Sequence, residues 1–405
     1  ALLDSAPISV LAASEKVSKL HSALTYAERL ILFSQSQQFS LSGNQYLSPK
    51  TVSITPTTDF INSDAARPVL AGSSVFFSFP RTGFSGVSEY YLSKDQLDSM
   101  EAQDVTAHIP KYIKGNIKKM ASCSSESVMA VLTDAAGSAN LYIYKYFLDT
   151  NKQRIQSAWF TYATGDNYSQ VLNIEFIGNK LYLMIKRGDV VYLEYIIFED
   201  SQTESNMDYD VLLDRKVAKS DVTIASSTTL TLPYKVTTNT RLVTTGSVAL
   251  ASTTTGTTTF TVSGYNLSDT EAANYISDFY VGELYEMAYT FTQPFLKTEK
   301  TIEGGRYQLQ RARLEYANAR TFTVDVTHHP TKPAPTQATH TNTFATDLDA
   351  IIGTADLQSG FYTFPIQERN DQLKVVIKNN TVYPSDFLSI DYEARAFSYG
   401  TRWKG

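Results

Sequence analysis

Alternation of apolar and polar residues is the strongest pattern in the last third of the chain, residues 279–405. The stretch 321–326 reads Thr-Phe-Thr-Val-Asp-Val, and the stretch 373–378 reads Leu-Lys-Val-Val-Ile-Lys. Successive side chains of a β-strand point to opposite faces of its sheet, so a period of two residues is typical of half-buried strands. The pattern therefore predicts that this part of the chain is built from such strands.

Shorter strands are predicted in the first half of the chain. Apolar runs at residues 29–33 and 75–79 indicate two buried strands. From Ser127 to Phe198, strand-like segments follow one another at intervals of about 8–12 residues, separated by turns at Gly178-Asn179 and Gly188-Asp189. This spacing is typical of a sandwich, a barrel or propeller blades. The segments are too different in sequence to count as a repeat.

One of these segments predicts which side chains share a face. Alternation places one group of apolar residues on one face of the strand: Leu141, Ile143 and Phe147. It places three aromatic residues on the other face: Tyr142, Tyr144 and Tyr146.

The stretch Asp221–Gly264 is rich in Thr, Ser and Val and low in complexity. Because Thr is β-branched, we interpret it as an inserted β-subdomain with exposed Thr faces, and disorder is the alternative. Directly after it, residues 268–271 read Ser-Asp-Thr-Glu and fit a capping box. They predict one short helix over 272–276. A further short helix is possible over 12–20.

Composition agrees with an all-β protein and argues against tight binding of DNA. The chain has 405 residues, with 26 Tyr and 21 Phe, and a formal net charge of -6. Aromatic residues favour strands, and an acidic chain has no general basic field for nucleic acid. The single cysteine, Cys123, excludes an internal disulfide, and we expect it to be a core residue. We find no signal peptide pattern and no run of about 20 apolar residues.

No catalytic constellation stands out, so we expect no catalytic residue, no cofactor and no metal ligand. His328 and His329 would point to opposite faces of a strand, which makes a metal site with His340 a weak hypothesis. Three carboxylate pairs have the spacing that places both groups on one strand face: Asp208 with Asp210, Asp347 with Asp349, and Asp391 with Glu393. A glycosidase could use such a pair, but solvated surface is the commoner explanation.

Other short motifs have simple structural explanations. Arg187-Gly188-Asp189 spells an integrin-type tripeptide, but it lies where a hairpin needs a tight turn. Gly304-Gly305-Arg306 lacks the spacing and the Lys of a phosphate loop, so a hairpin is the better interpretation. Four lysines surround Tyr112 and could touch phosphate, although a solvated loop is the preferred interpretation: Lys111, Lys114, Lys118 and Lys119.

Three stretches of the chain form a further pattern. The first runs from Arg29-Leu30-Ile31-Leu32-Phe33-Ser34 to Val75-Phe76-Phe77, and the second is the segment 104–113. The third comprises four pieces of the last part: Tyr280-Val281-Gly282, 291–295, 311–314 and 360–365. In this order and spacing, the three stretches resemble the nozzle proteins, or tail tubular proteins B, of short-tailed bacteriophages.

The resemblance implies a structural component of the virion tail and not an enzyme. It implies six copies around a channel through which DNA is ejected, docked below an adaptor ring of the tail tubular protein A type and contacting tail fibres. The implied all-β fold has propeller-like blades over 1–205, a Thr-rich nozzle-like insertion over 206–267 and a C-terminal β-sandwich-like platform over 268–405. Family members are usually longer at the N-terminus, and the chain starts at Ala1. We therefore expect a fragment or a processed product.

Two other classes of function are alternatives. A glycan-binding or receptor-binding tail module would need an exposed aromatic platform, for which the face of Tyr142, Tyr144 and Tyr146 is the candidate. A polysaccharide-degrading tail enzyme would need two carboxylates about 5–10 Å apart in a cleft.

Overall fold

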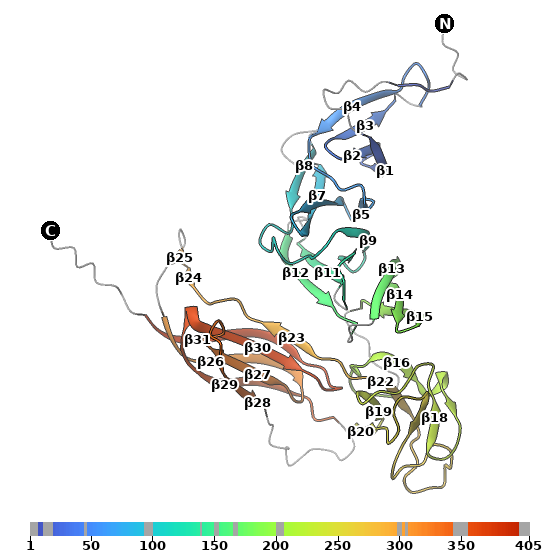
Figure 1. Cartoon of the computed structure of the whole chain (residues 1–405), viewed down its shortest axis with the longest axis vertical. Helices are drawn as coiled ribbons and strands as arrows, with labels where there is room; N and C mark the ends of the chain where they lie inside the picture. The colour runs from blue at the N-terminus through green and yellow to red at the C-terminus, as the bar shows by residue number, and fades with distance from the viewer. Residues whose placement is uncertain are drawn as a thin grey trace, which may run out of the picture. The chain divides into compact units, whose positions relative to one another are not determined.

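The structure is a computed structural model, and its described residues form antiparallel β-sheets (Figure 1). These residues are 7–10, 19–43, 47–92, 100–137, 140–149, 154–164, 169–199, 206–297, 302–303, 307–342 and 355–396. They contain no α-helix and two short 3-10 segments, Lys219–Asp221 (η1) and Asn370–Gln372 (η2). The all-β prediction is therefore confirmed. The chain divides into two compact units, Ala1–Asp200 and Ser201–Gly405.

The first unit is a series of four sheets, each made of strands that follow one another along the chain. Their strand orders are β1-β2-β3-β4 (sheet 1), β5-β6-β7-β8 (sheet 2), β12-β11-β10-β9 (sheet 3) and β13-β14-β15 (sheet 4). The strands of sheets 1 and 2 are β1 (Leu20–Tyr26), β2 (Arg29–Ser34), β3 (Gln38–Ser42), β4 (Ser53–Thr58), β5 (Val69–Ala71), β6 (Ser74–Arg81), β7 (Phe84–Leu92) and β8 (Met100–Asp104). Those of sheets 3 and 4 are β9 (Ile117–Cys123), β10 (Val128–Thr133), β11 (Leu141–Leu148), β12 (Arg154–Tyr162), β13 (Ser169–Ile177), β14 (Lys180–Arg187) and β15 (Val190–Ile197).

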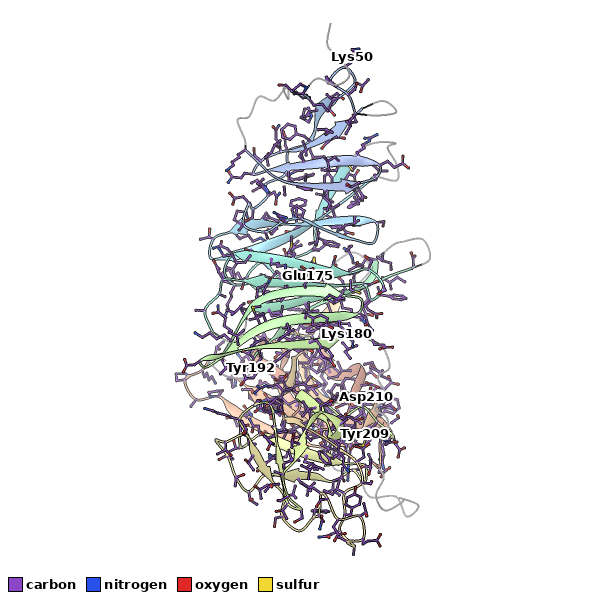
Figure 2. The ribbon with its side chains drawn as sticks, turned by 90° about the vertical axis from the view of Figure 1, so that its right-hand side faces the viewer. Lys50, Glu175, Lys180, Tyr192, Tyr209 and Asp210 are labelled. Carbon is purple, nitrogen blue, oxygen red and sulfur yellow. The ribbon has the colours of Figure 1, made fainter. Side chains whose placement is uncertain are left out.

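Neighbouring sheets of this unit pack face to face. Successive residues of one strand pack against the sheet on one side and the sheet on the other side in turn. In β6, Val75 and Phe77 join a core with Ile31 and Phe33 of sheet 1. Phe76, between them, packs with residues of sheet 3. Both faces of sheet 2 are thus covered, which explains why β6 reads as a continuous apolar run. Figure 2 shows these sheets as successive layers.

Sheet 3 follows the same rule and confirms the predicted faces of β11. Leu141 and Ile143 pack against sheet 4, together with Leu183 and Ile185. Three tyrosines of β11 point the other way, into the core shared with sheet 2: Tyr142, Tyr144 and Tyr146. Cys123 lies buried in the core shared with sheet 4, which confirms its prediction as a core residue.

An ion pair and a cluster of rings join sheets 2 and 3. Arg154 of β12 pairs with Glu89 of β7, and the exposed fractions of their side chains are only 20% and 13%. The guanidinium carbon of Arg154 lies 5.8 Å from the ring centroid of Tyr144. Tyr144 stacks on Trp159 with a centroid distance of 4.7 Å. Because few waters reach these charges, the pair and the rings hold the two sheets in one register.

The second unit contains four sheets of three or four strands and a separate two-stranded pair. Their strand orders are β16-β22-β19-β20 (sheet 5), β17-β18-β21 (sheet 6), β23-β30-β27-β28 (sheet 7) and β29-β26-β31 (sheet 8). The strands of sheets 5 and 6 are β16 (Asp214–Ala218), β17 (Thr223–Ile224), β18 (Thr229–Thr231), β19 (Thr240–Thr244), β20 (Ala249–Ala251), β21 (Thr259–Thr261) and β22 (Phe279–Glu283). The others are β23 (Met287–Thr290), β26 (Tyr307–Ala319), β27 (Thr323–His328), β28 (Thr336–Thr341), β29 (Gln358–Arg369), β30 (Leu373–Asn379) and β31 (Asp386–Ala396), with a separate pair β24 (Leu296–Lys297) and β25 (Ile302–Glu303).

The alternation at 321–326 and 373–378 predicted half-buried strands, and the structure confirms them as β27 and β30. Val324, Val326, Val375 and Ile377 of sheet 7 join one hydrophobic core with Leu314 and other residues of sheet 8. The intervening residue Asp325 turns toward Lys378, with 3.3 Å between the carboxylate oxygen and the ammonium nitrogen. None of the sheets described here closes on itself.

The Thr-rich stretch is ordered, and Thr side chains occupy one face of sheet 6. Leu230 and Phe260 face inward and are fully buried, whereas their neighbours in the same strands are threonines. The prediction of β-structure over disorder is therefore confirmed for this stretch, and its assignment as a separate inserted subdomain stays a prediction.

The predicted helix over 272–276 is wrong. The side chain of Asn266 accepts hydrogen bonds from the backbone of Ser268 and Asp269. Successive turns follow, in which Ala272 N–H bonds to Asp269 O and Tyr275 N–H bonds to Ala272 O. Local side-chain bonds here outcompete the helix. Most of the second predicted helix, 12–20, lies outside the described residues, and its last residue begins β1.

We expect the substitution Glu89→Ala to destabilise the first unit by about 1–3 kcal/mol, because it leaves the charge of Arg154 without its partner between two sheets. Urea unfolding followed by Trp159 fluorescence, in a Trp403→Phe background, measures this. Glu101→Ala, at an exposed position of β8, is the control and should change the free energy of unfolding by less than about 0.5 kcal/mol. Equal effects of the two substitutions would contradict the structural role of the pair.

Alkaline pH should weaken the same region. Burial, and secondarily the nearby charge of Glu89, raises the pKa of Tyr146 to about 12. An unfolded tyrosine ionises near pH 10, so the unfolded state loses its proton first and stability falls as pH rises from about 10 to 12. Circular dichroism across this range should show a smaller pH-dependent loss in Tyr146→Phe than in the wild type. In exposed Tyr195→Phe the loss should remain that of the wild type.

Candidate functional site

The histidines of the metal hypothesis are not brought together. His328 Nε2 lies 2.8 Å from the carbonyl oxygen of Ile366, and His329 Nε2 lies 3.4 Å from a carboxylate oxygen of Glu368. The ring of His340 stacks on Phe364, with a centroid distance of 6.2 Å. In the described part of the chain, no group of three or more His, Cys, Asp or Glu side chains could hold a metal ion.

The two carboxylate pairs within the described residues do not form a two-carboxylate cleft. Glu393 of β31 is bound by Arg311, with 2.5 Å between Nε and Oε2, and Asp391 lies opposite Arg313 in the strand register. Asp208 is exposed beside buried Tyr209, in a segment without strand pairing. Figure 2 labels Tyr209 and Asp210. The third pair, Asp347 with Asp349, lies outside the described residues.

The tripeptide Arg187-Gly188-Asp189 serves as a turn. Gly188 has a φ of 60°, a backbone conformation that favours glycine. Arg187 holds Glu194 across the hairpin through two hydrogen bonds, of 2.9 and 2.8 Å, and donates a third to the carbonyl oxygen of Thr164. The guanidinium of Arg187 therefore binds groups of its own chain, which agrees with the interpretation of the tripeptide as a hairpin turn.

The lysine cluster around Tyr112 is partly neutralised. Lys119 pairs with Glu175 at 2.8 Å, and Lys118 lies 3.6 Å from Asp134. Lys111 and Lys114 are exposed at the surface of a turn. Two of the four charges are therefore offset locally, which weakens the case for a phosphate site. Gly304-Gly305-Arg306, the other phosphate candidate, lies outside the described residues.

The tyrosine face of β11 is not a ligand platform. Tyr142, Tyr144 and Tyr146 are 2%, 0% and 7% exposed, because sheet 2 covers them. This face is therefore not the exposed aromatic platform that the glycan-binding alternative would need. Strand alternation identified a shared face, but only the packing of the next sheet decided that the face is a core.

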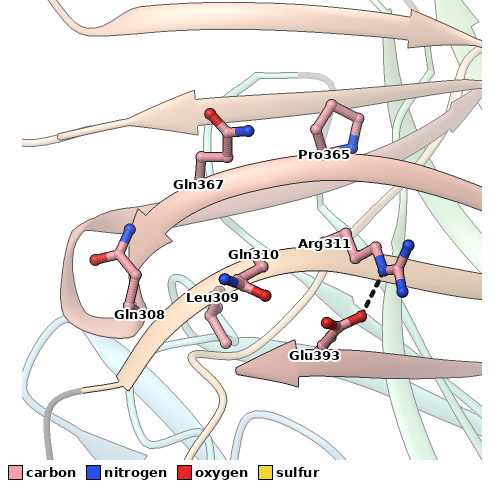
Figure 3. A pocket seen from close by; sticks show the side chains of 7 residues that line it. All are labelled: Gln308, Leu309, Gln310, Arg311, Pro365, Gln367 and Glu393. Carbon is pink, nitrogen blue, oxygen red and sulfur yellow. Dashed lines mark hydrogen bonds and ion pairs between the residues drawn. The ribbon is translucent and has the colours of Figure 1, made fainter. Parts of the chain in front are cut away.

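The surface of sheet 8 carries a shallow polar hollow (Figure 3). Three glutamines and an ion pair line it with two less polar residues: Gln308, Gln310, Gln367, Arg311, Glu393, Leu309 and Pro365. The strand register shifts between Leu309 and Arg311, so β26 bulges here. Amides can both donate and accept hydrogen bonds, and the only two charges cancel. The hollow could therefore hold a neutral polar group and does not favour a phosphate.

Exposed apolar side chains gather at the edge of sheet 4. Leu193 and Tyr195 of β15 are 73% and 54% exposed, and Phe160 of the outermost strand of sheet 3 is 37% exposed. Lys180 lies over the ring of Tyr195, 4.9 Å from its centroid. Figure 2 labels Lys180, Glu175 and Tyr192 on this sheet. No sequence motif indicated this surface, since its residues form ordinary strand patterns.

The Thr-rich surface carries almost no charge. The stretch 222–267, which the structure describes throughout, contains no Asp or Glu and only two basic residues, Lys235 and Arg241. Arg241 bonds to the carbonyl oxygens of Thr238 and Thr240 at 2.8 and 2.9 Å. Hydroxyl groups there bond to each other, as in the pair Thr254 and Thr261.

Within the described residues, no helix is long and apolar enough to cross a membrane.

Comparison with known proteins agrees with the resemblance found in the sequence. A family model described as "Bacteriophage nozzle protein" matches residues 1–403. The chain is also similar to the tail tubular protein gp12 of Escherichia phage T7, with 29% identity over 217 residues. This alignment covers 53% of the chain and 27% of the T7 protein. The chain belongs to the bacteriophage nozzle protein family and is a structural component of the virion tail.

Proposed function

We propose that this protein forms part of the nozzle through which a phage ejects its DNA, as six copies around a central channel. The observation that carries the proposal is the family match, which spans residues 1–403. A ring built from repeated head-to-tail contacts needs two different surfaces that are complementary to each other, and no catalytic residue. We therefore propose a role without enzymatic activity.

The charge distribution supports a channel wall that does not hold DNA. Strong non-specific binding of DNA requires many Lys and Arg contacts to phosphate. Here the net charge is -6, and several cations face carboxylates of the same chain, as in the pairs Arg311 with Glu393 and Arg187 with Glu194. The nearly uncharged Thr-rich stretch is a second surface past which DNA could slide.

We further propose that the chain has three functional parts and two tail partners. Residues 1–205 would be propeller-like blades, 206–267 a nozzle-like insertion and 268–405 a β-sandwich-like platform. The successive four-stranded sheets of the first unit support the blades, and the core shared by sheets 7 and 8 supports the platform. An adaptor ring of the tail tubular protein A type and tail fibres are the expected partners.

The mass of the native assembly tests the proposed ring of six copies. Light scattering and negative-stain images of the purified full chain should show closed six-membered particles with a central hole, because head-to-tail contacts close when their rotation permits. A monomer at all concentrations, together with absence of the protein from purified virions, would contradict the proposal.

Binding of duplex DNA tests the proposal that the channel wall does not hold DNA. At physiological salt we expect a dissociation constant weaker than about 10⁻⁴ M, the weak limit of ordinary non-specific binding, with little dependence on salt. Fluorescence anisotropy of a labelled duplex measures both quantities. Replacing Thr231 and Thr259 by Lys should produce measurable, salt-dependent binding, whereas replacing them by Ser should not. Tight, salt-dependent binding of the duplex by the wild type would refute the proposal that the channel wall makes only weak contacts with DNA.

A further inference from the structure

The polar hollow on sheet 8 lies where two strands depart from regular geometry (Figure 3). In β26 the register shifts between Leu309 and Arg311 against both of its neighbouring strands. In β29, Gln367 has a φ of 53°. Such irregularities re-aim side chains. Here they bring Gln310 and Arg311, which are consecutive residues, to the same hollow.

Three of the polar side chains at the hollow satisfy one another, together with Arg395. Arg311 Nε donates to Glu393 Oε2 at 2.5 Å. With its amide oriented so that both polar atoms have partners, Gln310 donates to Glu393 Oε1 at 3.2 Å and accepts from Arg395 Nε at 3.0 Å. These charges are therefore already paired within the sheet.

The other two amides of the hollow, those of Gln308 and Gln367, have different surroundings. Within the described residues, neither side chain makes a hydrogen bond to another group of the chain. Each amide offers two N–H donors and one acceptor oxygen. The hollow has a volume of about 700 Å³, which falls within the range of about 300–1,000 Å³ for ligand sites. Gln308 and Gln367 thus offer a ligand both donors and acceptors from two neighbouring strands.

The outward-facing residues of β29 extend this surface along the sheet. Phe361, Thr363 and Pro365 are exposed and alternate with residues that are less exposed. Phe361 is 53% exposed, and the guanidinium carbon of Arg313 lies 3.7 Å from the centroid of its ring. A strand rises about 3.3 Å per residue, so this ring lies roughly 13 Å along β29 from Pro365 in the hollow.

The formal net charge of this face is zero. Strands β26 and β31 contribute three cations and three carboxylates to it: Arg311, Arg313, Arg395, Glu315, Asp391 and Glu393. Strong binding of a polyanion needs several unpaired cations. A protein partner usually places large side chains in a desolvated apolar pocket, whereas Leu309 in the hollow is only 2% exposed. The face therefore fits a neutral ligand with many hydroxyl groups better.

A neutral oligosaccharide has that chemistry. Its hydroxyl groups donate and accept hydrogen bonds, as the amides of Gln308 and Gln367 do. The C–H groups on the faces of its sugar rings are apolar and can stack on an exposed aromatic ring such as Phe361.

We propose that the outer face of sheet 8 binds a neutral oligosaccharide, with Gln308 and Gln367 bonded to its hydroxyl groups and Phe361 stacked on one of its sugar rings. This binding activity goes beyond the proposed nozzle role. It does not depend on a ring of copies, because all of its residues belong to one sheet of one chain. In a component of the virion tail, such a site would hold the particle to a sugar-coated surface.

Binding of the full chain to immobilised hexasaccharides tests the site. The neutral probes are maltohexaose, cellohexaose, mannohexaose and chitohexaose, and the acidic probe is hexagalacturonate. At least one neutral probe should bind, and hexagalacturonate should bind at least tenfold more weakly, because no excess of cations favours it. β-Casein, an extended polypeptide, serves as the protein probe and should not bind.

Two substitutions in the hollow should each weaken binding of the neutral probe at least tenfold. Gln308→Met keeps the length of the side chain and removes its hydrogen bonds. Gln367→Gly removes the amide at a φ of 53°, which suits glycine, so the backbone is kept. Gln337→Met, at an exposed position of β28 in sheet 7, is the matched control and should bind like the wild type.

The stacking contact has its own variant. Phe361→Ala should also weaken binding of the neutral probe at least tenfold. Its control is Phe147→Ala, which removes a phenylalanine that is 62% exposed in the first unit and should leave binding unchanged. Thermal melts followed by circular dichroism check that each variant is folded.

The outcomes separate this site from the nozzle proposal. The oligosaccharide site would be overturned if none of the four neutral probes binds, if the three site variants bind as well as their controls, or if hexagalacturonate or β-casein binds equally well. Rings that do not bind sugar would leave the nozzle proposal intact. Selective binding by a chain that forms no rings would support the sugar site and count against the six-membered assembly.

Discussion

Burial of both faces of short antiparallel sheets is the constraint on which the first unit depends. Val75 and Phe77 fill one core and Phe76 fills the next, so one strand serves two neighbours. Each sheet depends on at least one neighbouring sheet, because burial of its apolar side chains supplies most of the favourable free energy. The same constraint makes the end of the series distinctive. Sheet 4 has a covered inner face, and β15 is its last strand among the described residues.

Several charges in this protein are paired within the chain. Arg154 is held by Glu89 between two sheets, and Arg187 is held by Glu194 across a hairpin. Such pairs contribute little to stability when exposed and more when water is excluded.

The described surfaces of the chain differ in chemistry. On β15, Leu193 and Tyr195 expose apolar side chains. The Thr-rich stretch 222–267 offers hydroxyl groups and almost no charge. The polar hollow on sheet 8, with its three glutamines, is a third surface of different chemistry.

The sequence by itself determined the fold class, the shared faces and the family. Alternation identified the faces of β11 and the core side of Val324 and Val326, because strand geometry is local. The capping-box pattern failed for the helix at 272–276, where the side chain of Asn266 stabilises turns instead. Only the tertiary structure decided that the tyrosine face of β11 is buried. Burial depends on which sheet lies opposite, and no local pattern records that.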